Sequence, residues 1–381
     1  MVEPHGNRLI EQLTPPEKAE SAKEEAREFP ALNISNETFI EIFSIAIGTY
    51  SPLEGFLVEA EFHSVLETNR LLDGLPWTIP IVLDVPNYVA DTVELGQHLA
   101  LTYDDRIVAT IDVQSKFSPR KNNWVKSVFG TTDVSHPGVK STGARHDILL
   151  GGKIDLFERP TAPFSQYHFT PKETRVLFKT RGWKQVVGFQ TRNAPHIGHE
   201  YLQKTALTFV DGLFINPVIG KKKKGDFKDE VILDSYQTLL DHYYLKERAV
   251  LGTLLTEMHY AGPKEAIHHS IMRKNFGCSH FIIGRDHAGV GNYYAPYAAQ
   301  EIFDDFPDLG IVPLFFRSFY RCKKCGSIVN EKICPHSAEF HTNFSGTKIR
   351  DMLVAKTIPP ADQMRPEVSE TILRYNQPFV Q

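Results

Sequence analysis

Ten consecutive residues carry most of the reactive side chains that this sequence places close together. The segment at 190–199 reads Gln-Thr-Arg-Asn-Ala-Pro-His-Ile-Gly-His. An apolar run precedes it and predicts a buried strand, and a helix-forming stretch follows it. We therefore expect His196 and His199 on one face of a first helical turn, where free N–H groups and the helix dipole favour an anion. With Arg192 beside them, the segment predicts a polyphosphate site.

The alternative for this histidine pair is an exposed position on an ordinary helix. A strand-to-helix turn that serves packing alone would use apolar residues. Here Gln190, Arg192 and Asn193 crowd together with both histidines. This crowding favours a functional segment.

A second polar loop, Gly-Arg-Asp-His-Ala-Gly at 284–289, follows the apolar run at 281–283. A structural turn would need its glycines but not three consecutive polar residues. Arg285 could face Arg192 across a small oxyanion, because a guanidinium presents two donors in one plane. We therefore expect this loop to belong to the same site.

Two further segments remain open to two interpretations. The lysine run Lys221–Lys224 lies between glycines at P-loop spacing, but Asp226 and Phe227 stand where a P-loop requires Lys and Ser/Thr. It is either a solvated run or a mobile loop that attracts the β- and γ-phosphates. Ser345 caps a predicted helix that carries Arg350, either as an ordinary helix start or as a second phosphate contact.

The cysteines predict a metal site near the C-terminal end. Cys322, Cys325 and Cys334 have the spacing of zinc ligands, and a histidine follows at 336 or 341. We favour His341 as the fourth ligand, because His336 lies only two residues past Cys334 and has less room to fold back. Four protein ligands leave no open position, so zinc here should be structural.

Alternating strand and helix patterns from about residue 175 predict a doubly wound parallel sheet. The expected strands are 186–189, 213–219, 249–255, 281–284 and 311–316, and the expected helices are 197–210, 230–246, 263–276 and 292–303. Ligands of such sheets bind at the carboxyl ends of the strands. All three polar segments around 190, 220 and 284 follow such ends, which predicts one active site.

The flanking regions differ from this pattern. Residues 1–168 form a predicted β-rich domain with a helix near 38–47 and strands at 78–85 and 106–113, and 159–163 looks like a linker. The α/β domain is expected at 169–318. The unit at 319–381 contains the cysteine cluster.

Composition limits the class of protein. The chain has 381 residues and a net charge of −4, so nothing attracts it globally to nucleic acid or to an anionic membrane. We find no apolar run long enough to span a bilayer and no signal peptide. Only four cysteines occur, three of them clustered. A reducing, cytoplasmic location is expected.

These motifs resemble those of the ATP sulfurylase (sulfate adenylyltransferase) family over essentially the whole chain. The resemblance rests on 190–199, 272–289 and 345–350, with similar stretches at 50–56 and 260–266. It implies a PUA-like N-terminal domain, a Rossmann-like nucleotidyltransferase domain of the H-I-G-H type, and a single-function form without a kinase domain. Two departures are the order Ala194-Pro195 and the zinc cluster, which only part of the family has.

The resemblance also implies the reaction and its residues. ATP and sulfate give adenylyl sulfate and pyrophosphate in a homodimer, with Mg²⁺ arriving on ATP. Catalysis would use Thr191, Arg192, Asn193, His196 and His199. Substrate binding would use Gln190, Arg192, Asn193, Gly284, Arg285, Asp286, His287 and the backbone of Ala288.

Two rival functions remain at this point, and the physiological direction of the reaction stays open. A tRNA-linked ligase would also use H-I-G-H, but it should carry a K-M-S-K-S-like loop, where this chain has S-G-T-K. An RNA-binding protein would explain the zinc cluster and the lysine run. That interpretation leaves the segments at 190–199 and 284–289 without a role.

Overall fold

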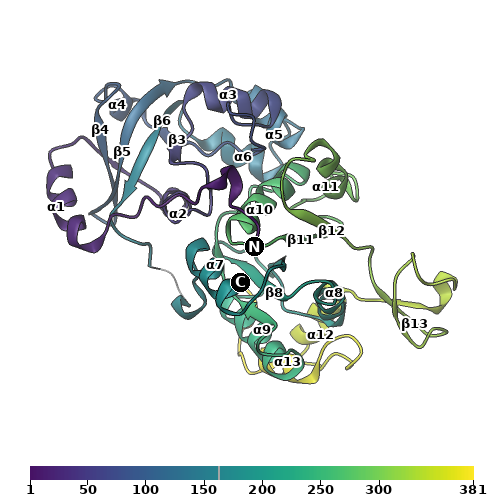
Figure 1. Ribbon diagram of the computed structural model, residues 1–381. Coiled ribbons are helices and arrows are strands. Elements are labelled where there is room, and N and C mark those ends of the chain that lie inside the picture. The colour runs from purple at the N-terminus through teal and green to yellow at the C-terminus, as the bar shows by residue number, and fades with distance from the viewer. Residues whose placement is uncertain (162–163) are drawn as a thin grey trace.

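The computed structural model describes residues 1–161 and 164–381. Two residues of the predicted linker, 162 and 163, lie outside this description. Two sheets organise the chain, one in each half, and a small third sheet follows them (Figure 1).

The N-terminal sheet has the order β1-β4-β5-β6-β2, with β3 beside β6. Its pairings are antiparallel except for β1 with β4. The strands are β1 (Ala31–Asn33), β2 (Gly55–Phe56), β3 (Leu83–Val85), β4 (His98–Tyr103), β5 (Arg106–Phe117) and β6 (Ile148–Leu156). The helices are η1 (His5–Asn7), α1 (Pro16–Ala26), α2 (Asn36–Ala46), α3 (Glu59–Thr68), α4 (Asn87–Ala90), α5 (Lys121–Phe129) and α6 (Pro137–Ala144).

This half confirms the predicted β-rich domain with an early helix. The predicted strand at 78–85 is shorter than expected, since only its last three residues pair in β3. Pro80 lacks a backbone N–H and cannot donate to a ladder, which accounts for the late start. The preceding residues, Thr78 to Val82, are nevertheless buried.

The second sheet is parallel throughout, in the order β10-β8-β7-β11-β12, with β9 also on β8. Its strands are β7 (Val186–Thr191), β8 (Gly212–Ile219), β9 (Ala249–Leu251), β10 (Leu254–Leu255), β11 (His280–Ile283) and β12 (Val312–Phe315). Its helices are η2 (Ser165–Tyr167), α7 (Pro171–Thr180), α8 (Ile197–Leu207), α9 (Asp229–Tyr243), α10 (Pro263–Asn275), α11 (Ala298–Glu301) and η3 (Ile302–Asp305).

The predicted helix at 292–303 is wrong over its first half. The structure has turns before α11, which is short and continues as η3. Pro296 disfavours helical conformation in the residue before it, and Tyr297 takes the left-handed conformation with φ 72°. The other three predicted helices are confirmed, with small shifts of their ends.

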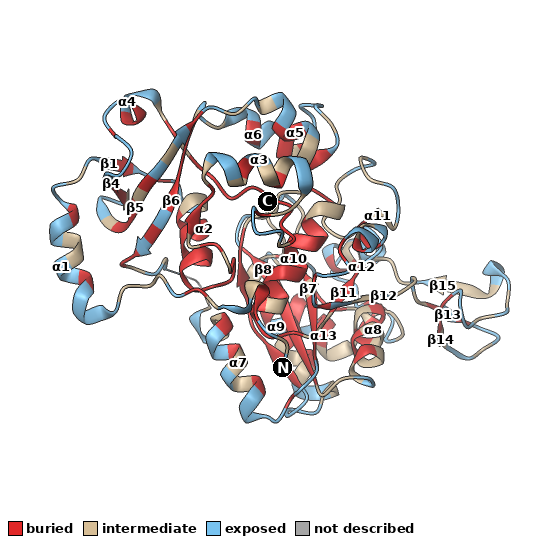
Figure 2. Cartoon of the chain, turned by 45° about the horizontal axis from the view of Figure 1, so that its top comes forward, coloured by how far each residue is buried: buried red, intermediate tan, exposed pale blue. Residues whose placement is uncertain are grey.

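Alternate residues of the parallel strands face two different cores. Phe214 and Phe281 join one core with α10 and the N-terminal half. Leu213 and Ile282 join the other, with α9 and the two C-terminal helices. Strands β7 to β11 and helix α10 are therefore buried almost throughout, whereas the edge strand β12 is partly exposed (Figure 2).

Helix α10 connects the two halves of the molecule. The side-chain amide of Asn275 accepts from the backbone N–H of His5 and donates to the carbonyls of Thr49 and Ser51, at 2.9–3.0 Å. The hydroxyl of Thr78 donates to the Lys264 carbonyl. One helix therefore packs on the sheet and on the N-terminal domain together.

The C-terminal region has two parts. A small antiparallel sheet, β13 (Tyr320–Cys322), β14 (Ser327–Val329) and β15 (His341–Asn343), carries η4 (Ala338–Phe340) and projects away from the rest of the molecule (Figures 1 and 2). Helices α12 (Gly346–Val354) and α13 (Pro366–Leu373) then return to pack in the core of the second sheet.

Candidate active site

Three predicted segments meet at one edge of the parallel sheet. Strand β7 lies between β8 and β11, and the segments at 190–199, 220–226 and 284–289 follow the carboxyl ends of these three neighbours. The sheet therefore gathers residues that lie almost a hundred positions apart in the sequence. This is the edge at which parallel sheets bind ligands.

The two histidines stack on each other at the start of α8. His196 is the N-cap, and its Nδ1 lies 3.4 Å from the His199 N–H; the ring centroids are 3.8 Å apart. Burial lowers the pKa of His196 to about 4 and the pKa of His199 well below its usual value. Both rings are therefore neutral near pH 7, at a helix N-terminus that favours an anion.

The glycine between these histidines follows from close packing. A Cβ added at Gly198 would lie 2.9 Å from the ring of Phe344 and 3.0 Å from that of His196. Only glycine leaves room for both rings, and Phe344 comes from the chain just before α12. The histidine pair is thus packed against the C-terminal region.

Thr191 and Asn193 shape the turn between β7 and α8. The Thr191 hydroxyl lies 3.1 Å from both the N–H and the carbonyl of Asn193. The Asn193 side chain is exposed, and its oxygen accepts from Arg350 at 3.2 Å. Arg350, on the helix that Ser345 caps, therefore contacts the segment at 190–199. This contact fits the interpretation of that helix start as a second phosphate contact.

Arg192 is held by two residues that the sequence did not single out. Its Nη1 donates to the hydroxyl of Tyr260 at 2.9 Å, and its Nη2 lies 3.3 Å from Oδ2 of Asp226 and 3.4 Å from the Lys221 carbonyl. The side chain is 18% exposed. Asp226 follows the run of four lysines, and an acidic residue beside four cations was the sequence feature that could have pointed to this contact.

The lysine run is anchored rather than uniformly solvated. Lys222 is almost fully buried and pairs with Asp229 at 2.9 Å, and Lys223 lies 3.9 Å from the ring centre of Tyr260. Lys221 reaches Glu37 of the N-terminal domain at 3.3 Å. The loop therefore links Arg192 to the neighbouring domain.

Arg285 has a different setting from Arg192. It is exposed, and its guanidinium lies 5.8 Å from the ring centre of Tyr297 and 3.9 Å from Asp286. With Asp286 and His287 it lines a cavity of about 150 Å³ that also contacts the first residues of α10. Gly284 is exposed beside it, and Ala288 has φ 56°, with its carbonyl accepting the Gly262 N–H at 3.1 Å.

Gln190 and His287 meet at a third residue, His269, which the sequence did not single out. Nδ1 of His269 lies 3.0 Å from Nε2 of Gln190 and 3.0 Å from Nε2 of His287. His269 is fully buried on α10. A single histidine from a third segment thus touches both predicted binding segments, and two adjacent histidines inside a helical run, His268 and His269, offered no signal of this.

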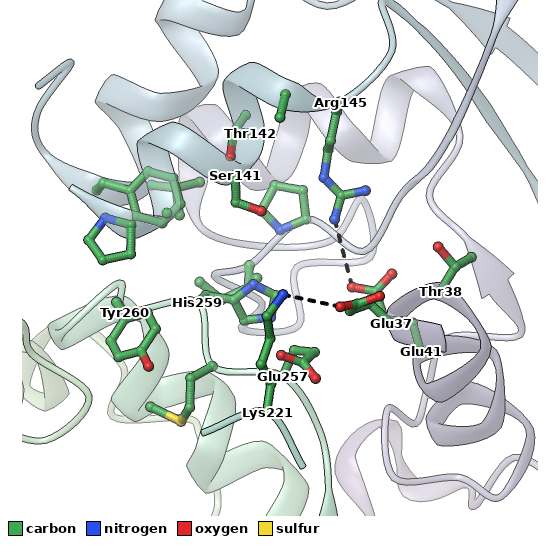
Figure 3. Close-up of a pocket in the computed structure, with 18 of the residues that line it drawn as sticks. Glu37, Thr38, Glu41, Ser141, Thr142, Arg145, Lys221, Glu257, His259 and Tyr260 are labelled. Atoms are coloured by element: carbon green, nitrogen blue, oxygen red, sulfur yellow. Dashed lines mark hydrogen bonds and ion pairs between the residues drawn. The ribbon is translucent and has the colours of Figure 1, made fainter. Parts of the chain in front are cut away.

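A larger cavity lies elsewhere, between the two halves of the molecule (Figure 3). It measures about 510 Å³ and is lined by Glu37, Glu41, Arg145, Lys221 and Tyr260 among others. None of its lining residues belongs to 190–199 or 284–289. It touches the predicted site only through the residues that hold Arg192.

The cysteine cluster has the donor set of a tetrahedral metal site. The ligand atoms of Cys322, Cys325, Cys334 and His336 all lie within 4.8 Å of one another. His336 Nδ1 lies 3.4, 3.3 and 3.9 Å from the three sulfurs in that order. These residues could hold a metal ion.

The choice of His341 as the fourth ligand is therefore wrong. The turn after Cys334 folds back far enough for His336 to face all three sulfurs. His341 lies on β15, where its ring stacks on Tyr320 at 3.8 Å, and its Nε2 is 3.4 Å from Cys334 alone. It is placed to hydrogen-bond a ligand sulfur.

No helix within residues 1–161 and 164–381 is long and apolar enough to cross a membrane.

Comparisons with known proteins agree along the whole chain. Residues 165–375 match the ATP-sulfurylase family model, and residues 2–159 match that of the PUA-like domain. A sulfate adenylyltransferase of Thermococcus onnurineus is 53% identical over 99% of both chains. One of Hyperthermus butylicus is 52% identical over 99% of this chain and 97% of its own.

One solved structure supports the fold alone. A hexameric APS kinase from Thiobacillus denitrificans superposes with a TM-score of 0.78 at 22% identity, covering 99% of this chain and 69% of that one. The sheet order, the segments at its edge and the relatives agree: the chain belongs to the ATP-sulfurylase family, with a PUA-like domain at its N-terminal end.

Proposed function

We propose that this protein is a sulfate adenylyltransferase, which converts ATP and sulfate reversibly into adenylyl sulfate and pyrophosphate. The observation that carries the proposal is the meeting of the segments at 190–199 and 284–289 at one sheet edge. Relatives named for this activity are about half identical along their full length.

The chemistry needs no proton acceptor. A sulfate oxygen attacks the α-phosphorus of ATP, the bond to the β-phosphate oxygen breaks, and pyrophosphate leaves. Sulfate is fully ionised at neutral pH, so the nucleophile has no proton to lose. The barrier lies in bringing two anions together, and the site must supply alignment and neutralising charge.

The predicted residues divide between the two anions. Arg192, Arg285, Gln190 and the backbone N–H of Ala288 would bind sulfate. His196, His199, Asn193 and Thr191 would hold the phosphates and the departing charge. Gly284, Asp286 and His287 would complete the nucleotide and sulfate pocket.

Neutral histidines suit this role. Burial keeps His196 and His199 uncharged in the free protein, because the charged form is poorly solvated there. A bound polyphosphate would offset that cost and raise both pKa values. The histidines could therefore bind as neutral donors or take up a proton as charge develops on the leaving pyrophosphate.

We propose that the cysteine cluster holds one structural Zn²⁺ through Cys322, Cys325, Cys334 and His336. Three sulfurs and one imidazole nitrogen are ligands that Zn²⁺ accepts in closed tetrahedral sites. Zinc would fix the fold of the projecting sheet. Mg²⁺ would arrive with ATP.

We also propose an oligomeric state and a cellular location for the protein. Edge strand β12 exposes Val312 and Phe315, by 51% and 40%, and we propose that a homodimer covers this edge. Reduced, unpaired cysteines support a cytoplasmic location.

The domain limits 1–168, 169–318 and 319–381 remain our proposal. The last domain has two parts, the projecting sheet and the helix pair α12–α13.

The proposed activity can be tested by measuring pyrophosphate release. We expect release only when ATP and sulfate are both present, with no stimulation by any amino acid. Release that ignores sulfate, or that needs an amino acid, would reject the assignment and favour a ligase. Salt-sensitive RNA binding without any release would favour the RNA-binding alternative.

A further inference from the structure

We infer that His269, oriented by Glu265, is a positioning residue for the sulfate site. The geometry that supports this is the shared contact of its Nδ1 with Gln190 and His287, 3.0 Å from each. The inference rests on the proposed function, since it assigns Gln190 and the 284–289 loop to sulfate. It adds a residue from α10 to the two segments at the sheet edge.

The protonation of His269 follows from its two neighbours. Its Nε2 faces Oε1 of Glu265 at 3.4 Å, one helical turn earlier on α10, and both side chains are fully buried. The Gln190 amide nitrogen can only donate, so Nδ1 carries the lone pair that accepts from it, and the ring proton belongs on Nε2, toward the Glu265 carboxylate. The Nε2 of His287 lies at the same distance from this Nδ1.

This arrangement fixes which atoms Gln190 can offer to a ligand. One N–H of its amide group donates to His269, so the amide is held in one orientation rather than free to rotate. The second N–H of the same amide remains available for an oxyanion. Without the acceptor on His269, the amide could turn its oxygen toward the anion, which would repel it.

Glu265 also acts on Arg192. Its two oxygens accept the backbone N–H groups of His259 and Ala261, each at 2.9 Å, on either side of Tyr260. Tyr260 has φ 60°, a conformation that costs energy for a residue with a side chain. These hydrogen bonds hold it there, and its hydroxyl accepts from Arg192 at 2.9 Å.

One turn of α10 therefore positions three residues of the proposed site, two of which, Gln190 and Arg192, are predicted to bind sulfate. His269 positions Gln190 and His287, and Glu265 positions Arg192 through Tyr260. The proposed phosphate-binding pair, His196 and His199, lies at the start of α8, and among the described residues no hydrogen bond links it to this turn. Loss of the turn should weaken sulfate binding far more than ATP binding.

The competing explanation is that His269 only fills the core. His268 beside it provides the comparison: it is equally buried and packs against the rings of Tyr50 and Trp77. Neither of its ring nitrogens has a hydrogen-bond partner among the described residues. A core role would make the two histidines behave alike.

The test compares two substitutions of nearly equal polarity in the full-length protein. His269→Asn places an amide oxygen near the position of Nδ1, whereas His269→Gln places its amide near Nε2 and removes the shared acceptor. We expect the Gln variant to raise the KM for sulfate about tenfold, the effect of losing one hydrogen bond, with the KM for ATP within about twofold. The Asn variant should recover most of the sulfate affinity.

His268→Gln is the matched control, and its KM for sulfate should stay at the wild-type value. If both KM values rise together in His269→Gln, or if the Asn variant is as impaired as the Gln variant, the positioning role is wrong. If the wild-type protein releases no pyrophosphate in response to sulfate, the proposed function fails instead.

A measurement on the unchanged protein covers the case in which a variant does not fold. Nitrogen-15 NMR of the wild-type protein labelled at histidine, with each ring assigned through its own backbone, should show His269 as a neutral ring protonated on Nε2. A His269 ring protonated on Nδ1 would overturn the inference.

Discussion

At the scale of single residues, the account depends on how Arg192 is held. Its guanidinium lies between Tyr260 and Asp226, which orients its planar donors while leaving part of the side chain open. Arg285 has no comparable anchor and is exposed. Arg192 is therefore held more firmly than Arg285 before substrate binds, and it should contribute more to aligning the oxyanion.

Replacing Arg192 by alanine should lower kcat/KM for sulfate by a factor of about 10²–10³, the usual effect of removing one transition-state donor. The melting temperature should change little, because the side chain is not part of either core. Steady-state rates and a thermal melt measure both quantities. Arg248→Ala is the control, since Arg248 binds the Asp211 carbonyl at the opposite, amino end of the sheet. Equal losses in the two variants would contradict the assignment.

At the scale of elements, hydrophobic runs predicted the parallel strands because a strand buried on both faces is almost wholly apolar. The two polar segments proposed for the active site could be recognised in the sequence because each is a run of polar residues directly after such a strand. Their partners could not: His269 and Glu265 lie inside a helix, and only the packing of α10 against β7 and β11 brings them to the site. The same limit explains the zinc site, where the fold of one turn decides between two histidines.

The projecting sheet gives a prediction at this scale. Wild-type protein should contain about one zinc per chain, and His336→Ala should lose it to a chelator much faster, because one of four ligands is gone. His341→Ala is the matched variant and should retain the metal, since it loses only a hydrogen bond to sulfur and a ring contact. Metal analysis after dialysis separates them. Zinc loss in His341→Ala alone would restore the original choice of ligand.

At the scale of the whole molecule, the two halves share one core through α10 and enclose the large cavity of Figure 3. Glu41 of the N-terminal domain is buried at this boundary, and burial raises its pKa to about 7, although Arg145 partly opposes the shift. The sequence offered no sign of this carboxyl, because Glu41 lies on an otherwise apolar helix face that becomes buried only when the halves pack.

Glu41 should make stability depend on pH. Its pKa in the folded protein is about 7, above the ordinary value of 4.5, so its stabilising contribution is complete below about pH 4.5 and is lost as the pH rises through 7. The full loss is about 3.5 kcal/mol, at ~1.4 kcal/mol per pKa unit. Glu41→Gln should therefore gain stability relative to wild type between about pH 5 and 8. Denaturant unfolding of both proteins at about pH 5 and pH 8 measures their free energies of unfolding. The prediction is contradicted if the stability of Glu41→Gln relative to wild type falls as the pH rises.

The central claim is that sulfate itself attacks the α-phosphorus of ATP at this sheet edge. The most direct test supplies sulfate labelled with oxygen-18 at every position and measures the nucleotide product by mass spectrometry. We predict adenylyl sulfate that retains all of the label, one labelled oxygen now bridging sulfur and phosphorus, with unlabelled pyrophosphate. Adenylyl sulfate that has lost a labelled oxygen, or label in pyrophosphate, would contradict the account.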